Sequence, residues 1–154
     1  MSKYSILSKY SIITGVVLSL YFIIMDLLGF SHLTGLRLFN GVILGAGIWW
    51  AVKSKTNTED WNYLTGLRSG FQTGIGALTL FCLVFLLYAG IINPDIVFYI
   101  NESIGAPFNF NIFLLLAVII LEGTAASAIM SLIVMQYYKS KEFKKKEVTQ
   151  PIES

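Results

Sequence analysis

Long apolar stretches separated by short polar segments dominate the chain. Four stretches are long enough to cross a hydrocarbon core of about 30 Å as helices that rise about 1.5 Å per residue. They cover about residues 12–28, 36–52, 74–92 and 112–135. The pattern therefore predicts an all-α fold, in which residues 1–138 form a polytopic membrane four-helix bundle.

Two connections between these stretches carry the amphipathic pattern of short interfacial helices. Before the third stretch, apolar residues recur at intervals of three or four, namely Trp61, Leu64, Leu67 and Phe71. This segment is expected to lie on the membrane surface or to run directly into the third span. After that span, Asn93-Pro94-Asp95 is typical of a helix start, and Gly105 and Pro107 of a helix end.

Composition and charge agree with a membrane protein and give it an orientation. The chain is 55% hydrophobic and 13% charged, which is too apolar to cover a soluble surface. With the N-terminus in the cytoplasm, every basic residue except Arg37 falls on the cytoplasmic side. Both termini are therefore expected on the cytoplasmic side of the membrane. The positive charge is explained by topology, so no nucleic-acid partner is expected.

Residues 139–154 form a Lys-rich cytoplasmic tail. The main predicted partner of the protein is the lipid bilayer. The tail is expected to be disordered and able to contact anionic lipid. The lone Cys82 lies within the third stretch and is interpreted as a small core side chain.

Small residues recur at intervals of four in three of the four stretches. They are Gly41 and Gly45, the series Gly66, Gly70 and Gly74, and Gly123 with Ser127. In lipid, such residues let helix backbones approach closely, which predicts helix packing or self-association through these faces. A phosphate-binding loop is not indicated, because no Gly-Lys-Ser/Thr motif follows the glycines.

Short motifs in the middle of the chain carry a resemblance to a known family. They are Leu36-Arg37 with Asn40, Trp49-Trp50 followed by Lys53, the spacing Tyr63, Gly66, Gly70 and Gly74, and Ile92-Asn93-Pro94-Asp95. In these residues the chain resembles small bacterial four-span inner-membrane proteins that are catalogued as a domain of unknown function. The resemblance implies four helices and a bacterial inner membrane, and it implies no mechanism.

Asp26 is the first of two acidic residues within the apolar stretches. It lies near the outer end of the first span, and the short turn after it should bring Arg37 close, with His32 nearby. One interpretation is an ion pair that holds the helical hairpin together. The other is a small polar mouth that titrates through His32. A metal site is not predicted, because these side chains offer too few ligands.

Glu122 is the second acidic residue. It lies ten residues beyond Ile112, about 15 Å along a helix and near the middle of a bilayer. We expect the carboxyl group to be protonated there. It could form a hydrogen bond between helices, with Asn40, Thr79 or Tyr88 as the available partner. It could instead serve as a proton or cation relay, or contact a polar ligand group.

No catalytic set, cofactor site or metal centre can be assembled from one His, one Cys and isolated polar residues. The function favoured by the sequence is therefore a structural or interaction subunit of a membrane complex or homo-oligomer. The alternative is a small transporter or channel-like protein, dimeric because four short spans seldom enclose a pathway, that uses Glu122.

Overall fold

The structure, a computed structural model, describes residues 3–29, 34–55, 62–104 and 110–149. Its elements are the α-helices α1 (Lys3–Leu27), α2 (Thr34–Lys53), α3 (Tyr63–Leu87), α4 (Ile96–Ile104) and α5 (Ile112–Thr149), with the π-helix η1 (Tyr88–Ile92) directly after α3. Within these described ranges there is no strand, so the all-α prediction is confirmed.

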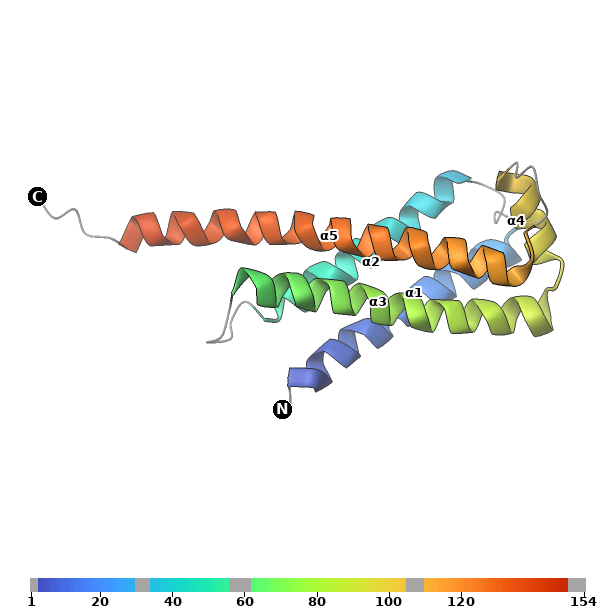
Figure 1. The fold of residues 1–154 in the computed structure, drawn as a ribbon, viewed down its shortest axis with the longest axis horizontal. Helices are drawn as coiled ribbons and strands as arrows, with labels where there is room; N and C mark the ends of the chain where they lie inside the picture. Colours follow the sequence, from blue (N-terminus) through green and yellow to red (C-terminus); the bar gives the residue numbers. More distant parts are fainter. Residues whose placement is uncertain (1–2, 30–33, 56–61, 105–109, 150–154) are drawn as a thin grey trace, which may run out of the picture.

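Helix α3 is the centre of the arrangement, because it packs against α1, α2 and α5. The helix α1 begins, and α5 ends, at the same end of the molecule, and α4 lies at the opposite end (Figure 1). The long helix α5 extends past the other helices toward the C-terminus (Figure 1).

Three helical segments are long and apolar enough to cross a membrane. They are Lys9–Leu27, Tyr63–Ile92 and Ile112–Lys139. Among the described side chains of α2, the apolar segment is Leu38–Lys53, which is shorter than these three. Three of the four predicted spans thus meet the length and composition of a membrane helix in the structure.

The outer surface is apolar, whereas small hydroxyl side chains lie inside. Leu27, Leu64 and Leu121 are each about three-quarters exposed, and many other large apolar side chains share this outward position. The buried hydroxyl residues are Thr14, Ser19, Ser69, Thr73, Ser127 and Ser131. In proteins surrounded by water, Ser and Thr are mostly exposed and large contiguous apolar surfaces are uncommon.

Two apolar clusters fill the interior. The first joins α1, α2, α3 and α5 through Leu18, Leu44, Ile48, Val52, Ala77, Val134 and Met135. The second joins the end of α3 to η1, α4 and α5 through Phe85, Tyr88, Ala89, Ile96, Ile100 and Leu115. The short helix α4 therefore closes one end of the interior with its apolar face, as expected for the short helix predicted after Asn93.

Two hydrogen bonds join Asn101 of α4 to Phe110, which lies just before α5. The Nδ2 group of Asn101 donates to the carbonyl oxygen of Phe110 at 2.9 Å, and the Phe110 N–H donates to Asn101 Oδ1 at 3.3 Å. This pair satisfies backbone groups that no helix satisfies at this point.

Two expectations differ from the structure. From Tyr63 onward α3 is one continuous helix, so the described residues before position 74 form no separate interfacial helix. The alternative of a direct run into the third span is the one observed. The tail was expected to be disordered from residue 139, but α5 continues to Thr149. Lys, Glu and Phe sustain a helix there, since neither Gly nor Pro interrupts it before Pro151.

Candidate functional site

The carboxyl group of Asp26 lies at the centre of a hydrogen-bonded cluster at the α4 end of the molecule. Its Oδ2 atom accepts a hydrogen bond from the Tyr88 hydroxyl at 2.6 Å and another from Asn93 Nδ2 at 3.0 Å. The three residues come from the last turn of α1, the start of η1 and the residue that follows η1. The cluster thus ties the end of α1 to the end of α3.

The local backbone explains why Asp26 needs these donors. The helix α1 ends just after it, where Gly29 takes a φ of +75° and donates its N–H to the Asp26 carbonyl at 2.9 Å. A carboxyl group near a helix C-terminus faces the negative end of the helix dipole. Two donors from another helix offset that unfavourable position.

The π-helix η1 places both donors on one side. The N–H of Asn93 donates to the carbonyl oxygen of Tyr88 at 3.0 Å, so five residues close a single wide turn. In an α-helix, residues five apart point in different directions, whereas this wider turn brings Tyr88 and Asn93 onto nearly the same face. Single π-turns of this kind occur often at functional sites.

Aromatic packing fixes the Tyr88 ring beneath its hydroxyl. Phe22 of α1 makes edge contacts with Phe81, Phe85 and Tyr88, with ring centroids 5.8, 5.4 and 5.8 Å apart. Tyr88 is only 5% exposed. The ring is therefore held in apolar surroundings while its hydroxyl reaches the carboxyl group, an arrangement that leaves few other orientations for the side chain.

The predicted partners of Asp26 are not the ones the structure describes. His32 and the Arg37 side chain lie outside the described residues, so the ion pair and the titrating mouth stay predictions. Sequence reasoning placed Tyr88 near Glu122 and missed its bond to Asp26. The topology held a usable signal, because Tyr88, Asn93 and Asp26 all lie near the outer ends of their predicted spans.

The side chain of Glu122 is exposed, on the side of α5 that faces away from the other helices. Within the described part of the chain it forms no hydrogen bond, and none of its three predicted partners reaches it. The Tyr88 hydroxyl bonds to Asp26, and the Thr79 hydroxyl donates to the carbonyl oxygen of Ile75 at 2.9 Å. The third, Asn40, keeps a buried Oδ1 atom that accepts no hydrogen bond from a described residue. The interhelical bond expected for Glu122 is thus absent between described residues of one chain.

The glycine series of α3 faces α5 and α2. A Cβ atom added at Gly70 would lie 2.8 Å from Ser131 Oγ and 3.1 Å from Ile48 Cγ2, and one added at Gly74 would lie 2.6 Å from Ser127 Cβ. Gly66, the first member of the series, is also buried. These separations are too short for a side chain, so the two backbones approach closely here.

The serines opposite the glycines do not leave unsatisfied hydroxyl groups. Ser127 Oγ donates to the carbonyl oxygen of Gly123 at 2.7 Å, and Ser131 Oγ donates to that of Ser127 at 2.7 Å. Each hydroxyl is satisfied within its own helix, four residues back. The serines therefore act as small, self-contained side chains at the contact.

The other small residues singled out in the sequence differ in their surroundings. A Cβ atom at Gly123 would meet the side chain of Leu78, and one at Gly45 would lie 3.3 Å from Met130 Sδ. Beyond its own turn of α2, no described atom lies within 4 Å of a Cβ atom added at Gly41. Three close approaches were missed: Gly15 faces Ala77 and Leu80, Gly47 faces Thr14, and Gly76 faces Ser11.

The chemistry available at these positions is limited. Among the described residues, no group of three or more His, Cys, Asp or Glu side chains is placed to hold a metal ion. The Asp26 cluster offers one carboxyl group with two donors, and Glu122 offers one carboxyl group facing outward. Both can exchange a proton or accept a hydrogen bond.

Comparison of the chain with protein-family models, with curated proteins and with solved structures found no match.

The glycine contact can be tested with the smallest possible side chain. Gly74→Ala introduces a methyl group against Ser127, and we expect it to lower the free energy of unfolding by about 1–3 kcal/mol through overpacking. Gly41→Ala is the matched control, because it lies in a helix with open space around it and should be neutral or stabilising by up to about 1 kcal/mol. Thermal unfolding in detergent measures both. Equal effects of the two variants would contradict the close contact.

The Asp26 cluster can be tested by removing one hydroxyl group. We expect Tyr88→Phe to destabilise the fold by about 1–2 kcal/mol, because Asp26 loses a donor while the ring packing is kept. Tyr63→Phe serves as the control, since no described residue bonds to that hydroxyl. The measurement is unfolding in detergent followed by circular dichroism, and an unchanged Tyr88→Phe midpoint would argue against the bond to Asp26.

Proposed function

We propose that this chain is a four-span α-helical protein of a bacterial cytoplasmic membrane that acts as a structural or interaction subunit. The observation that carries the proposal is the distribution of side chains, with large apolar groups outward and small hydroxyl groups inward. In water this surface would aggregate, whereas in lipid it is the favourable arrangement. The resemblance noted in the sequence supports the bacterial inner membrane.

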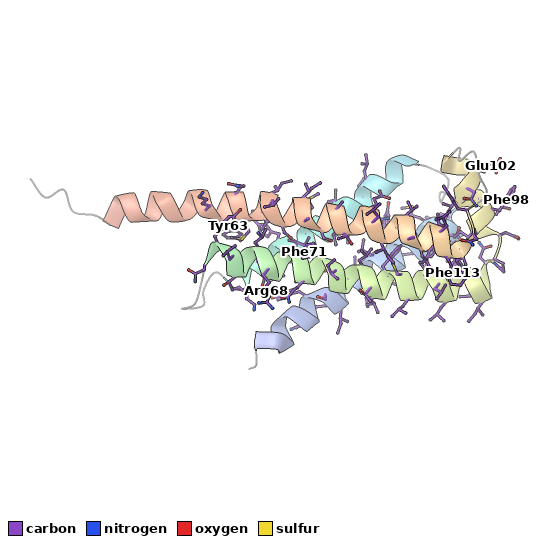
Figure 2. The ribbon with its side chains drawn as sticks, in the orientation of Figure 1. Tyr63, Arg68, Phe71, Phe98, Glu102 and Phe113 are labelled. Carbon is purple, nitrogen blue, oxygen red and sulfur yellow. The ribbon has the colours of Figure 1, made fainter. Side chains whose placement is uncertain are left out.

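Aromatic residues at both ends support this placement. At one end Trp49 contacts Tyr137 and Tyr138, with ring centroids 4.7 and 5.5 Å apart. At the other end Phe98 and Tyr99 of α4 are exposed (Figure 2 labels Phe98). Ile112 and Tyr137 are about 38 Å apart along α5 at 1.5 Å per residue. That length matches a hydrocarbon core with part of both headgroup layers, where aromatic side chains concentrate.

Charge supports the orientation with both termini in the cytoplasm. Figure 2 shows Arg68 near the start of α3, toward the end where α1 begins, and Glu102 on α4 at the opposite end. Lys53 ends α2, and Lys139 lies near the end of the apolar part of α5. Basic residues near span ends favour the cytoplasmic side.

The interaction role is supported by the apolar surface that the described helices leave uncovered. The apolar segment of α5 is the least covered of the three long ones, with 11% of its most apolar window buried. A helix with so much free surface can pack against lipid or against another helix. The glycine faces of α3 are occupied within the chain, so α5 is the better candidate for contacts with a partner.

Transport is the second candidate, and the position of Glu122 favours it. An ionisable residue deep in a membrane span is often part of a proton or ion path. Because Glu122 faces outward from α5, a path that uses it would have to run between two chains. The transport proposal therefore requires a dimer as well.

The topology can be tested with single cysteines in a Cys82→Ala background. Asn62 and Glu102 are both exposed. Asn62 directly precedes α3, and Glu102 lies on α4 at the other end of the molecule (Figure 2). In intact cells, a membrane-impermeant maleimide should label Glu102→Cys, and it should label Asn62→Cys only after the membrane is permeabilised. Labelling of both positions from the same side would contradict the proposed orientation.

The two functional candidates differ in proteoliposomes. If the chain is an interaction subunit, the purified wild-type protein and Glu122→Gln should show the same background flux of protons and monovalent cations. A pH-dependent flux in the wild type that Glu122→Gln abolishes would establish transport and overturn the subunit role. Dye-loaded vesicles without protein provide the leak control.

A further inference from the structure

We propose that the outward face of α5 binds a second copy of this chain, and that the Glu122 carboxyl groups of the two copies hydrogen-bond to each other. This inference rests on the membrane placement proposed above. It specifies the partner that the interaction role leaves open.

A regular seam runs along the outward face of α5. Its residues follow one another at alternating intervals of four and three, and all are exposed: Val118, Glu122, Ala125, Ile129, Leu132 and Gln136. Alternating intervals of four and three give the repeat with which two helices pack along their length in a left-handed coiled coil. This seam is present on a face that the chain itself leaves open.

The opposite face of α5 is already in use. Ser127 and Ser131 are fully buried against Gly74 and Gly70 of α3. Ala125 and Ile129 of the seam point about half a turn away from this contact, since successive residues of a helix are about 100° apart. One helix therefore presents two packing faces, of which the chain covers one.

Glu122 distinguishes the seam from an ordinary lipid-facing surface. It lies about 15 Å along the helix from Ile112, where hydrocarbon offers no hydrogen-bond partner. A carboxyl group placed there without hydrogen-bond partners is costly, and the acid can both donate and accept. Ala125, one turn further along the same seam, is small enough to let a second helix approach the carboxyl group.

A second copy supplies the missing donor and acceptor at the right depth. All copies insert with the same orientation, so two α5 helices that pair about a twofold axis along the membrane normal are parallel. Glu122 of one copy then lies opposite Glu122 of the other. A neutral carboxylic acid can donate one hydrogen bond and accept one, so the pair satisfies itself without any other group. A single polar residue in an apolar seam also fixes the register of the two helices.

Disulfide crosslinking in membranes tests the seam. In a Cys82→Ala background of the full chain, Ala125→Cys lies on the seam, and Ile120→Cys lies about half a turn away on the same helix. Ala125 is exposed and Ile120 is 48% exposed, so a thiol at either position is accessible to the oxidant. Treatment with copper phenanthroline should convert Ala125→Cys to a covalent dimer and leave Ile120→Cys monomeric. Equal crosslinking of both, or of neither, would overturn the proposed interface.

Substitution of the carboxyl group tests the pairing. Dimerisation in detergent, measured by energy transfer between labelled chains, should weaken about tenfold in Glu122→Leu, because the interhelical hydrogen bonds are lost. Glu122→Gln should keep dimerisation within about threefold of the wild type, since the amide also donates and accepts. Unchanged dimerisation in Glu122→Leu would overturn the pairing.

A second measurement distinguishes failure of the proposed dimer from failure of the proposed membrane placement. Extraction of the membranes at alkaline pH is performed on the same cells. If the chain is released as a soluble protein, the proposed function fails. If it stays in the membrane but Ala125→Cys forms no dimer, or crosslinks to a different protein, the membrane placement stands and the second copy is overturned.

Discussion

The close approach of α3 to its neighbours determines the rest of the arrangement. At Gly70 and Gly74 the backbone of α3 lies so near α5 that a single methyl group would collide with Ser127 or Ser131. At Gly15 the same holds for α1 against Ala77 and Leu80 of α3. With α1 and α5 held on α3 at short range, dispersion contacts accumulate along the helices. The apolar clusters at both ends then follow from where these helices lead.

This constraint also explains which polar residues are inside. A helix pair at short range has room for hydroxyl side chains but not for long polar ones, and each buried hydroxyl must be satisfied nearby. Ser19, Thr73, Ser127 and Ser131 all donate to the carbonyl oxygen four residues earlier in their own helix. These four buried hydroxyl groups therefore need no hydrogen bond to another helix. The contact between these helices depends on the shapes of their surfaces, so a larger side chain at the glycines would disrupt it.

The fold was largely predictable from the sequence, because its signals are local. Runs of apolar residues predict the long helices, and Asn93-Pro94-Asp95 predicts α4. The extension of α3 back to Tyr63 was only one of two alternatives, since amphipathic spacing is the same in a surface helix and in the first turns of a span. The helical end of α5 was missed because a run of lysines indicates solvent contact, which a helix and a disordered tail share.

The candidate site was less predictable, because it depends on which way helices face. The expected pairing of Asp26 used the nearest residues along the chain, whereas its described donors come from η1 and Asn93. No sequence pattern predicted the π-helix η1, which brings these donors together. Among the glycines, spacing did not distinguish Gly41, which has open space, from Gly74, which touches α5. Only the rotation of each helix about its axis separates the two, and that rotation is set by packing across the whole chain.

The two carboxyl groups within apolar segments differ in their hydrogen-bond partners. The difference indicates which of them the described chain satisfies by itself. Asp26 accepts two hydrogen bonds from another helix, so its surroundings need nothing further. Glu122 lies in the middle of its apolar segment on an exposed face, with no partner among the described residues. A chain that provides two donors for an acid near the end of a span would be expected to provide one for an acid in the middle, where the need is greater. The described residues supply no such donor to Glu122, and its position in a regular seam favours the helix of a second copy over lipid, as proposed above.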